Sequence, residues 1–148
     1  MQNGEAAVAK IKQANPSFDY ANVQLVQIDV SKKESIQAAA DFVKSKYGNV
    51  HVLINNVGID GDAEGAEMCF NVNIFGVYDT LVAFHPLMVP NQSSNIVVAS
   101  TLGASSLSAM PRSLRPVFED FNKLDISTVR SLVDDWIASA HGKPSEHP

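Results

Sequence analysis

Polar or small residues directly follow three short apolar runs in this sequence, and their types could act on a bound nucleotide. They are Asp29 with Val30, Asn56 with Val57 and Gly58, and Ser100 with Thr101. A carboxylate and the next backbone N–H can pair with an adenine ring, a glycine lets the backbone approach a ligand, and a hydroxyl can orient a carbonyl. In an open parallel sheet, ligands bind beyond the carboxyl ends of the strands. The three tips are therefore predicted to line one nucleotide crevice.

Each of these residues also has a purely structural interpretation. Asp29 alone could end a strand and start a turn, and Asn-Asn-x-Gly consists of ordinary turn residues. Asn73 lies beside an apolar helical stripe and could equally be a helix-surface asparagine. The residues gain weight from their shared order along the chain.

The strands that must position these tips follow from the hydrophobic pattern. Residues 23–30, 52–55 and 96–99 are short runs rich in β-branched and aliphatic residues, which predicts strands. The run at 52–55 is apolar enough to be covered on both faces. Helical patterns separate the runs, and this alternation is typical of a parallel α/β sheet.

Four stretches have apolar residues at three- and four-residue spacing, which predicts helices. They cover about residues 4–14, 31–48, 66–88 and 127–142. Ser31 with Glu34 predicts a capping box for the second helix, and Ser127 predicts a cap for the last. Gly76 lies inside the third helix, where glycine costs roughly 1 kcal/mol relative to alanine, so it indicates close packing against a neighbour.

The composition argues against several classes of function. The chain has 148 residues, 45% of them apolar, so it can form one domain with a core. Its net charge is −5 and its basic residues are scattered, which argues against a nucleic-acid partner. Cys69 is the only cysteine, which excludes an internal disulfide. No apolar run has the length of a signal peptide or a membrane helix, so we expect a cytoplasmic protein with no membrane partner.

No metal site is predicted. The four histidines lack the spacing of metal ligands. Acidic residues cluster at Asp60, Asp62, Glu64 and Glu67, but the alternation and terminal glutamate of a calcium-binding loop are missing. A solvated acidic loop is therefore the favoured interpretation.

Four segments, in this order, resemble the middle of a short-chain dehydrogenase/reductase: VQLVQIDV, VLINNVG, FNVNIFG and NIVVAST. The resemblance implies an α/β fold, a partial Rossmann-like parallel sheet of about three strands with flanking helices. It implies reduction of a carbonyl by a hydride from NADP, with NAD not excluded. It also implies that the cofactor is bound by Asp29, Val30, Asn56, Val57 and Gly58.

The resemblance further implies catalytic roles. Asn73 would anchor a water that relays protons, and Thr101 takes the position of the catalytic serine, with Ser100 beside it. Two residues depart from the usual family pattern, which has alanine at the place of Val57 and serine at the place of Thr101. Threonine keeps the hydroxyl but stiffens the side chain, so reduced or altered activity is expected.

Two family features cannot be found in the sequence. There is no glycine-rich phosphate turn, and Tyr20, Tyr47 and Tyr78 have no lysine four residues later. In the family, a tyrosine with its lysine protonates the substrate oxygen. We therefore expect residues 1–148 to form a single incomplete Rossmann-like domain, truncated at both ends and inactive alone. Residues 102–148 resemble the helical insertion of the carbonyl-reductase branch, which implies a monomer acting on a small ketone, aldehyde or quinone.

The missing segments also predict an unusual sheet. In the family, strands 23–30 and 52–55 are not neighbours, so each loses a ladder partner, and unpaired buried backbone groups cost about 1–3 kcal/mol each. We expect either three strands in the order 23–30, 52–55, 96–99, or a marginally stable chain. The functional alternative to an oxidoreductase is a non-catalytic short form that acts as a binding or interaction module.

Overall fold

A small parallel sheet lies at the centre of this computed structural model, which describes residues 2–99, 110–120, 122 and 124–145. Strand β1 (Val52–Asn55) pairs with β2 (Ser94–Val97), and Ile54 lies opposite Ile96. Pairing begins where the Ser94 N–H donates to the carbonyl of His51 at 2.7 Å, so β2 starts two residues earlier than predicted. The predicted α/β class with a parallel sheet is confirmed.

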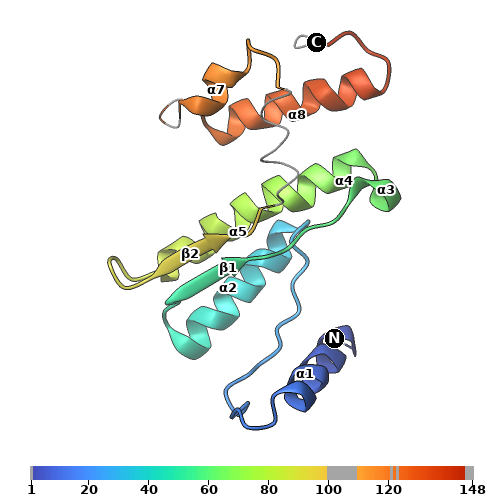
Figure 1. Cartoon of the computed structure of the whole chain (residues 1–148). Helices are drawn as coiled ribbons and strands as arrows, with labels where there is room; N and C mark the ends of the chain where they lie inside the picture. The colour runs from blue at the N-terminus through green and yellow to red at the C-terminus, as the bar shows by residue number, and fades with distance from the viewer. Residues whose placement is uncertain (1, 100–109, 121, 123, 146–148) are drawn as a thin grey trace.

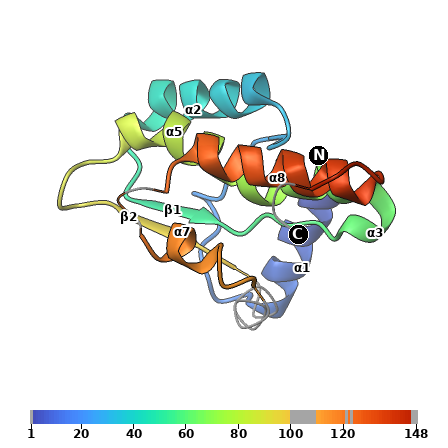
Figure 2. The same ribbon diagram turned by 90° about the horizontal axis from the view of Figure 1, so that it is seen from above.

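Two helices cover the same face of this sheet. They are α2 (Lys33–Tyr47) and α5 (Val77–Phe84), which lie side by side (Figure 1) and above the strands in the view of Figure 2. The hydrophobic core fills the space between these helices and β1. It contains Ala39, Ala40, Phe84 and Leu87, against which Leu53 of β1 packs.

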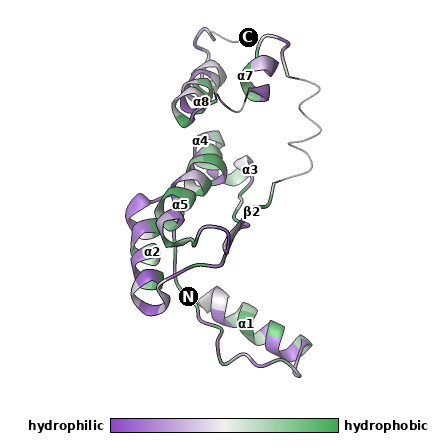
Figure 3. Cartoon of the chain, turned by 90° about the vertical axis from the view of Figure 1, so that its left-hand side faces the viewer, coloured by the Kyte–Doolittle hydropathy of each residue, from purple (hydrophilic) through white to green (hydrophobic). Residues whose placement is uncertain are grey.

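The helices from the two ends of the chain lie at opposite ends of the molecule (Figure 3). Helices α7 (Arg115–Glu119) and α8 (Ile126–Ala140) form one end, and α1 (Gln2–Ala14) forms the other. The rings of Phe70 and Trp136 meet edge to face at 5.4 Å and so attach α8. Among the described residues, no helix combines the length and apolar character needed to cross a membrane.

The strand predicted at residues 23–30 is not formed, and the predicted three-stranded sheet is wrong. This segment has no regular secondary structure and no ladder partner among the described residues. It is instead attached to α2 by side chains, because Lys46 and Tyr47 both donate to the Gln24 side-chain oxygen, Tyr47 at 2.9 Å. A strand exists only through pairing with a neighbour, so extended residues without one remain a loop.

The prediction that residues 52–55 are covered on both faces is also wrong. Leu53 and Asn55 face the helices, whereas Ile54 is 58% exposed and Ile96, beside it on the same face, is 47% exposed. Both helices next to the strands lie on one side, so the other face of the sheet meets solvent. An apolar strand therefore has one face uncovered.

Both predicted helix caps are wrong, although the helices themselves are confirmed. Helix α2 begins at Lys33, its N-cap Lys32 makes no side-chain cap bond, and Gly48 ends it with φ 77. The Ser31 hydroxyl instead donates to Asp29 at 2.6 Å. Because that hydroxyl already has a partner two residues earlier, the predicted capping box does not form.

Helix α8 is capped by Asp125 rather than by Ser127. The Asp125 carboxylate accepts the Thr128 N–H at 2.7 Å and the Ser127 hydroxyl at 2.6 Å. Hydrogen bonds from the Ser127 hydroxyl first, and from the Thr128 N–H next, lower the pKa of Asp125 below its ordinary value of 3.8. An ionised Asp125 therefore stabilises the start of this helix.

The long helix predicted at residues 66–88 is confirmed as one continuous helical run with a wide turn inside it. The run consists of α4 (Ala66–Phe70), the π-helical turn η1 (Asn71–Gly76), α5 and the short 3-10 turn η2 (His85–Leu87). A Cβ on Gly76 would lie 2.5 Å from the carbonyl oxygen of Val30. The close packing that the glycine indicated is therefore backbone against backbone.

We expect the substitution Gly76→Ala to destabilise the fold by about 1–3 kcal/mol, because the added methyl forces the helix away from Val30. Chemical denaturation measures this change. The matched control is Gly4→Ala in α1, where a Cβ would meet only the flexible Leu25 side chain at 3.4 Å. This control should be neutral or stabilising by up to about 1 kcal/mol. Equal effects of the two substitutions would contradict the packing argument.

We expect Asp125 to make helix α8 sensitive to acid. Folding lowers the pKa of this carboxyl, so its contribution is complete above the unfolded pKa of about 4 and is lost as the pH falls through the folded pKa. Thermal unfolding followed by circular dichroism at pH 7 and pH 3 tests this. Asp125→Asn should lose less stability between these two pH values than the unmodified chain. Asp134→Asn on the same helix is the control and should behave like the unmodified chain.

Candidate functional site

The first predicted tip is a turn that leads into α2, in which Asp29 is exposed and Val30 is partly buried. The Asp29 carboxylate accepts the Ser31 hydroxyl at 2.6 Å and the Ser31 N–H at 3.1 Å, and Lys32 approaches its other oxygen at 3.0 Å. These hydrogen bonds, the hydroxyl first, lower the pKa of Asp29, so the carboxylate is ionised at neutral pH. Its two oxygens have further lone pairs, which leaves room for a ligand donor.

The second tip, from Asn56 to Gly58, leaves β1 directly and is exposed. The preceding residue, Asn55, is only 5% exposed, and its side-chain amide donates to the Asn95 side-chain oxygen at 3.2 Å. This bond joins the two strands just before the tip begins. The buried Asn55 side chain is therefore hydrogen-bonded within the sheet, whereas Asn56 faces solvent.

Asn73 holds the loop that follows this second tip. It lies in η1, where its side-chain oxygen accepts the Ile59 N–H at 2.9 Å and its amide donates to the Ile59 carbonyl at 2.8 Å. The same amide lies 3.2 Å from the sulfur of Cys69, and a Cβ on Gly58 would lie 3.7 Å from the Asn73 oxygen. The Asn73 side chain thus fixes the backbone at Ile59 through two hydrogen bonds.

The same π-helical turn also touches the first tip. Gly76 contacts the carbonyl of Val30, and the Asn71 side-chain amide lies 3.4 Å from the Ser31 carbonyl. Both tips are therefore attached to six consecutive residues of one helix, η1 (Asn71–Gly76). This arrangement brings Asp29 and Val30 into the same region of the molecule as Asn73 and Gly58.

The third predicted tip, Ser100 with Thr101, lies outside the described residues. The described residues show only the end of β2 and the two residues that lead toward this tip. The Val98 N–H donates to the Asn55 carbonyl at 2.8 Å, one residue after β2 ends. Because the two strands are parallel, the chain leaves β2 at the same end of the sheet as Asn56 leaves β1 (Figure 1).

Sequence reasoning missed several residues that hold this region together. Asn71 and Asn95 lie close to the tips, and the Ser35 hydroxyl accepts the Asp29 N–H at 2.8 Å. A polar residue in an apolar segment was the only signal for the two asparagines. Ser35 lies six residues after Asp29, and this spacing matches no known capping or turn motif. The contact is therefore seen only in the folded turn.

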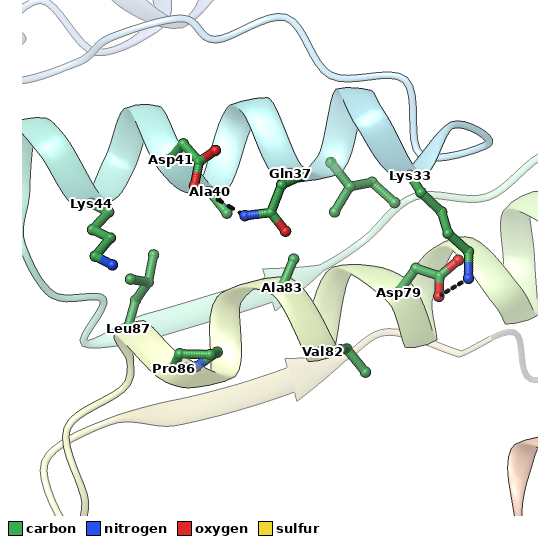
Figure 4. A pocket seen from close by; sticks show the side chains of 11 residues that line it. Lys33, Gln37, Ala40, Asp41, Lys44, Asp79, Val82, Ala83, Pro86 and Leu87 are labelled. Carbon is green, nitrogen blue, oxygen red and sulfur yellow. Dashed lines mark hydrogen bonds and ion pairs between the residues drawn. The ribbon is translucent and has the colours of Figure 1, made fainter.

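A groove lies between α2 and α5 (Figure 4). It measures about 350 Å³, and across it Lys33 pairs with Asp79 at 3.2 Å. Gln37 donates to Asp41 at 3.0 Å along its wall. The groove contains none of the predicted site residues, so it does not belong to the same site.

The acidic loop forms a short helix instead of a metal site. Asp60 caps α3 (Gly61–Glu64), and its carboxylate accepts the Asp62 N–H at 3.3 Å. In the described part of the chain, no group of three or more histidine, cysteine or acidic side chains could hold a metal ion.

Comparison with known proteins identifies relatives of this chain. A sequence profile of the family described as "short chain dehydrogenase" matches residues 1–112. Carbonyl reductase [NADPH] 1 of Bos taurus is 32% identical over 127 residues, which are 79% of this chain and 46% of that protein. Short-chain dehydrogenase/reductase 1 of Saponaria officinalis is 28% identical over 165 residues, which are 92% of this chain and 53% of that protein.

A solved structure shares the fold. Salutaridine reductase from Papaver somniferum superposes with a TM-score of 0.72 at 21% identity, covering 98% of this chain and 63% of the reductase. The chain spans about half the length of the curated relatives that it matches. Since the family profile covers well over half of this sequence, the chain belongs to the short-chain dehydrogenase family.

Proposed function

We propose that this chain carries the cofactor-side part of an NAD(P)H-dependent carbonyl reductase. The observation that supports this most directly is the attachment of two predicted cofactor tips to the single turn η1. Asp29 with Val30 would receive the adenine ring, and Asn56, Val57 and Gly58 would approach the ribose next to it. The exposed carboxylate of Asp29 and the exposed backbone of Gly58 suit these roles.

The proposed chemistry assigns each residue a limited task. The bound cofactor supplies a hydride to the carbonyl carbon. Thr101, with Ser100 beside it, would hold the carbonyl oxygen by a hydroxyl hydrogen bond. The Asn73 side chain is hydrogen-bonded to the Ile59 backbone. Asn73 would therefore use its own backbone to anchor a water molecule in a proton relay. The substrate would be a small ketone, aldehyde or quinone.

We propose NADP as the preferred cofactor. The support comes from the relatives, since the bovine carbonyl reductase carries NADPH in its name. We also propose that residues 102–148 form a helical insertion on the substrate side and that the protein acts as a cytoplasmic monomer. The helices α7 and α8 in this segment are in keeping with that assignment.

This chain alone should not turn over substrate. None of its three tyrosines is followed by a lysine at the fourth position, so the proton donor of the family is missing from the sequence. We propose that the activity belongs to a longer protein that contains this sequence. The coding sequence after Pro148 tests this, because an in-frame Tyr-x-x-x-Lys supports the enzyme.

The second candidate function is a non-catalytic short form that binds a nucleotide or a partner. The absence of a Tyr-x-x-x-Lys pair favours it, and so does the uncovered apolar face of the sheet, where Ile54 and Ile96 meet solvent. A stop codon directly after Pro148 in an abundant transcript would favour this candidate over the enzyme.

We expect the purified chain to bind NADPH weakly and to reduce no carbonyl compound. Cofactor fluorescence measures binding, and loss of absorbance with a quinone measures turnover. Asp29→Asn should weaken binding several-fold, because it replaces the charged acceptor proposed for the adenine amino group by a neutral amide with only one acceptor oxygen. Asp19→Asn is the matched control, since Asp19 is also exposed and accepts a backbone N–H two residues later, from Ala21 at 2.8 Å. Equal affinity of the two variants would contradict the adenine assignment.

A further inference from the structure

We propose that η1 (Asn71–Gly76) is a spacer that sets the distance between the two cofactor tips, with Asn71 and Gly76 positioning the first tip and Asn73 positioning the second. The role in cofactor binding rests on the function proposed above. The spacer itself rests on contacts made by three residues of one turn. In this scheme Asn71 is a positioning residue that acts on Asp29 through the Ser31 carbonyl.

The wide geometry of the turn is what allows Asn71 and Gly76 to act together. In an α-helix with 3.6 residues per turn, positions five apart are rotated by about 140° and face different directions. In a π-helix the residue at i bonds to i+5, so positions five apart lie almost one above the other. Asn71 and Gly76 are five apart, and a Cβ on Gly76 would lie 3.2 Å from the Asn71 carbonyl oxygen. Gly76 therefore faces the Val30 carbonyl, and Asn71 faces the Ser31 carbonyl that follows it in the chain.

The two contacts with the first tip complement each other. Gly76 removes the side chain that would keep the helix away from Val30, and Asn71 supplies an amide donor to the Ser31 carbonyl at 3.4 Å. The Gly76 contact sets the distance between the helix and the first tip, and the Asn71 amide provides a hydrogen bond for the Ser31 carbonyl. An alanine at either position would lose one of these two functions.

Asn73 contacts a different segment. Its amide group exchanges two hydrogen bonds with the Ile59 backbone, at 2.9 Å and 2.8 Å, which is the arrangement of a ladder pair. The turn therefore holds the first tip through Asn71 and Gly76 and the second through Asn73. Each tip has its own contact, so each can be loosened separately.

The turn itself is held from other sides. Phe75 is buried, and the Arg130 guanidinium of α8 lies 3.8 Å from its ring centroid. The buried Thr80 hydroxyl donates to the Gly76 carbonyl at 2.7 Å. Val72 is buried as well. A turn that is packed and hydrogen-bonded from several sides can therefore fix the distance between the two tips attached to it.

The test is site-resolved amide hydrogen exchange on the whole chain, because each tip offers its own reporter. Ser31 and Lys32 have hydrogen-bonded amides directly after the first tip, and Ile59 has one directly after the second. Asn71→Asp removes the donor without changing side-chain size. It should speed exchange at Ser31 and Lys32 about three- to tenfold, which corresponds to the loss of one modest hydrogen bond, and change Ile59 less than about twofold.

Three further variants complete the exchange experiment. Asn71→Ala removes the donor without adding charge and should give the same pattern, whereas Asn73→Ala should speed exchange at Ile59 and leave Ser31 nearly unchanged. Asn49→Asp, at an exposed asparagine after α2, is the matched charge control and should change neither reporter. Equal acceleration at both tips by any single variant, or none by Asn71→Ala, overturns the spacer.

Titration with AMP then connects the spacer to cofactor binding. Asn71→Asp and Asn71→Ala should weaken AMP binding about threefold or more, in step with the loosened turn, and Asn49→Asp should not. If the unmodified chain binds no AMP, the nucleotide part of the proposed function fails. The exchange pattern still decides whether η1 sets the spacing of the two tips.

Discussion

The approach of Gly76 to the carbonyl oxygen of Val30 is the contact on which the arrangement of this region depends. Since no side chain separates the two backbones, the position of the Asp29–Val30 turn follows the helix directly. The hydrogen bonds from Asn73 to Ile59 connect the loop after β1 to the same turn. One rigid helical segment thereby replaces the sheet as the element that relates the two tips.

This role of the helix matters because the sheet is small. Two strands alone are marginal in water, and here stability comes from the packing of α2 and α5 on one face. The opposite face leaves Ile54 and Ile96 in solvent, and in the described part of the chain residues 23–30 have no strand beside them. An uncovered apolar face and unpaired strand edges favour association with other chains. The marginal stability expected from the missing ladder partners stays a prediction.

The successes and failures of sequence reasoning have identifiable causes. The helical stripe at residues 66–88 and the unusual glycine within it were predictable, because periodicity and the cost of a helix-interior glycine are local properties. The caps were wrong because Ser31 and Ser127 each found an aspartate two residues earlier in the chain. Several side chains could satisfy the same backbone groups, and the sequence does not rank these local alternatives.

The sequence by itself determined the order of the elements, the α/β class and the positions at which polar residues follow apolar runs. Family membership could also be inferred from four short segments. Only the tertiary structure decided that residues 23–30 form no strand and that one face of β1 is exposed, because pairing and coverage depend on which neighbours are present. It also decided that the helix widens at Asn71–Gly76, since a π turn is stabilised by contacts with Val30, Ile59 and Arg130, which lie far away in the sequence.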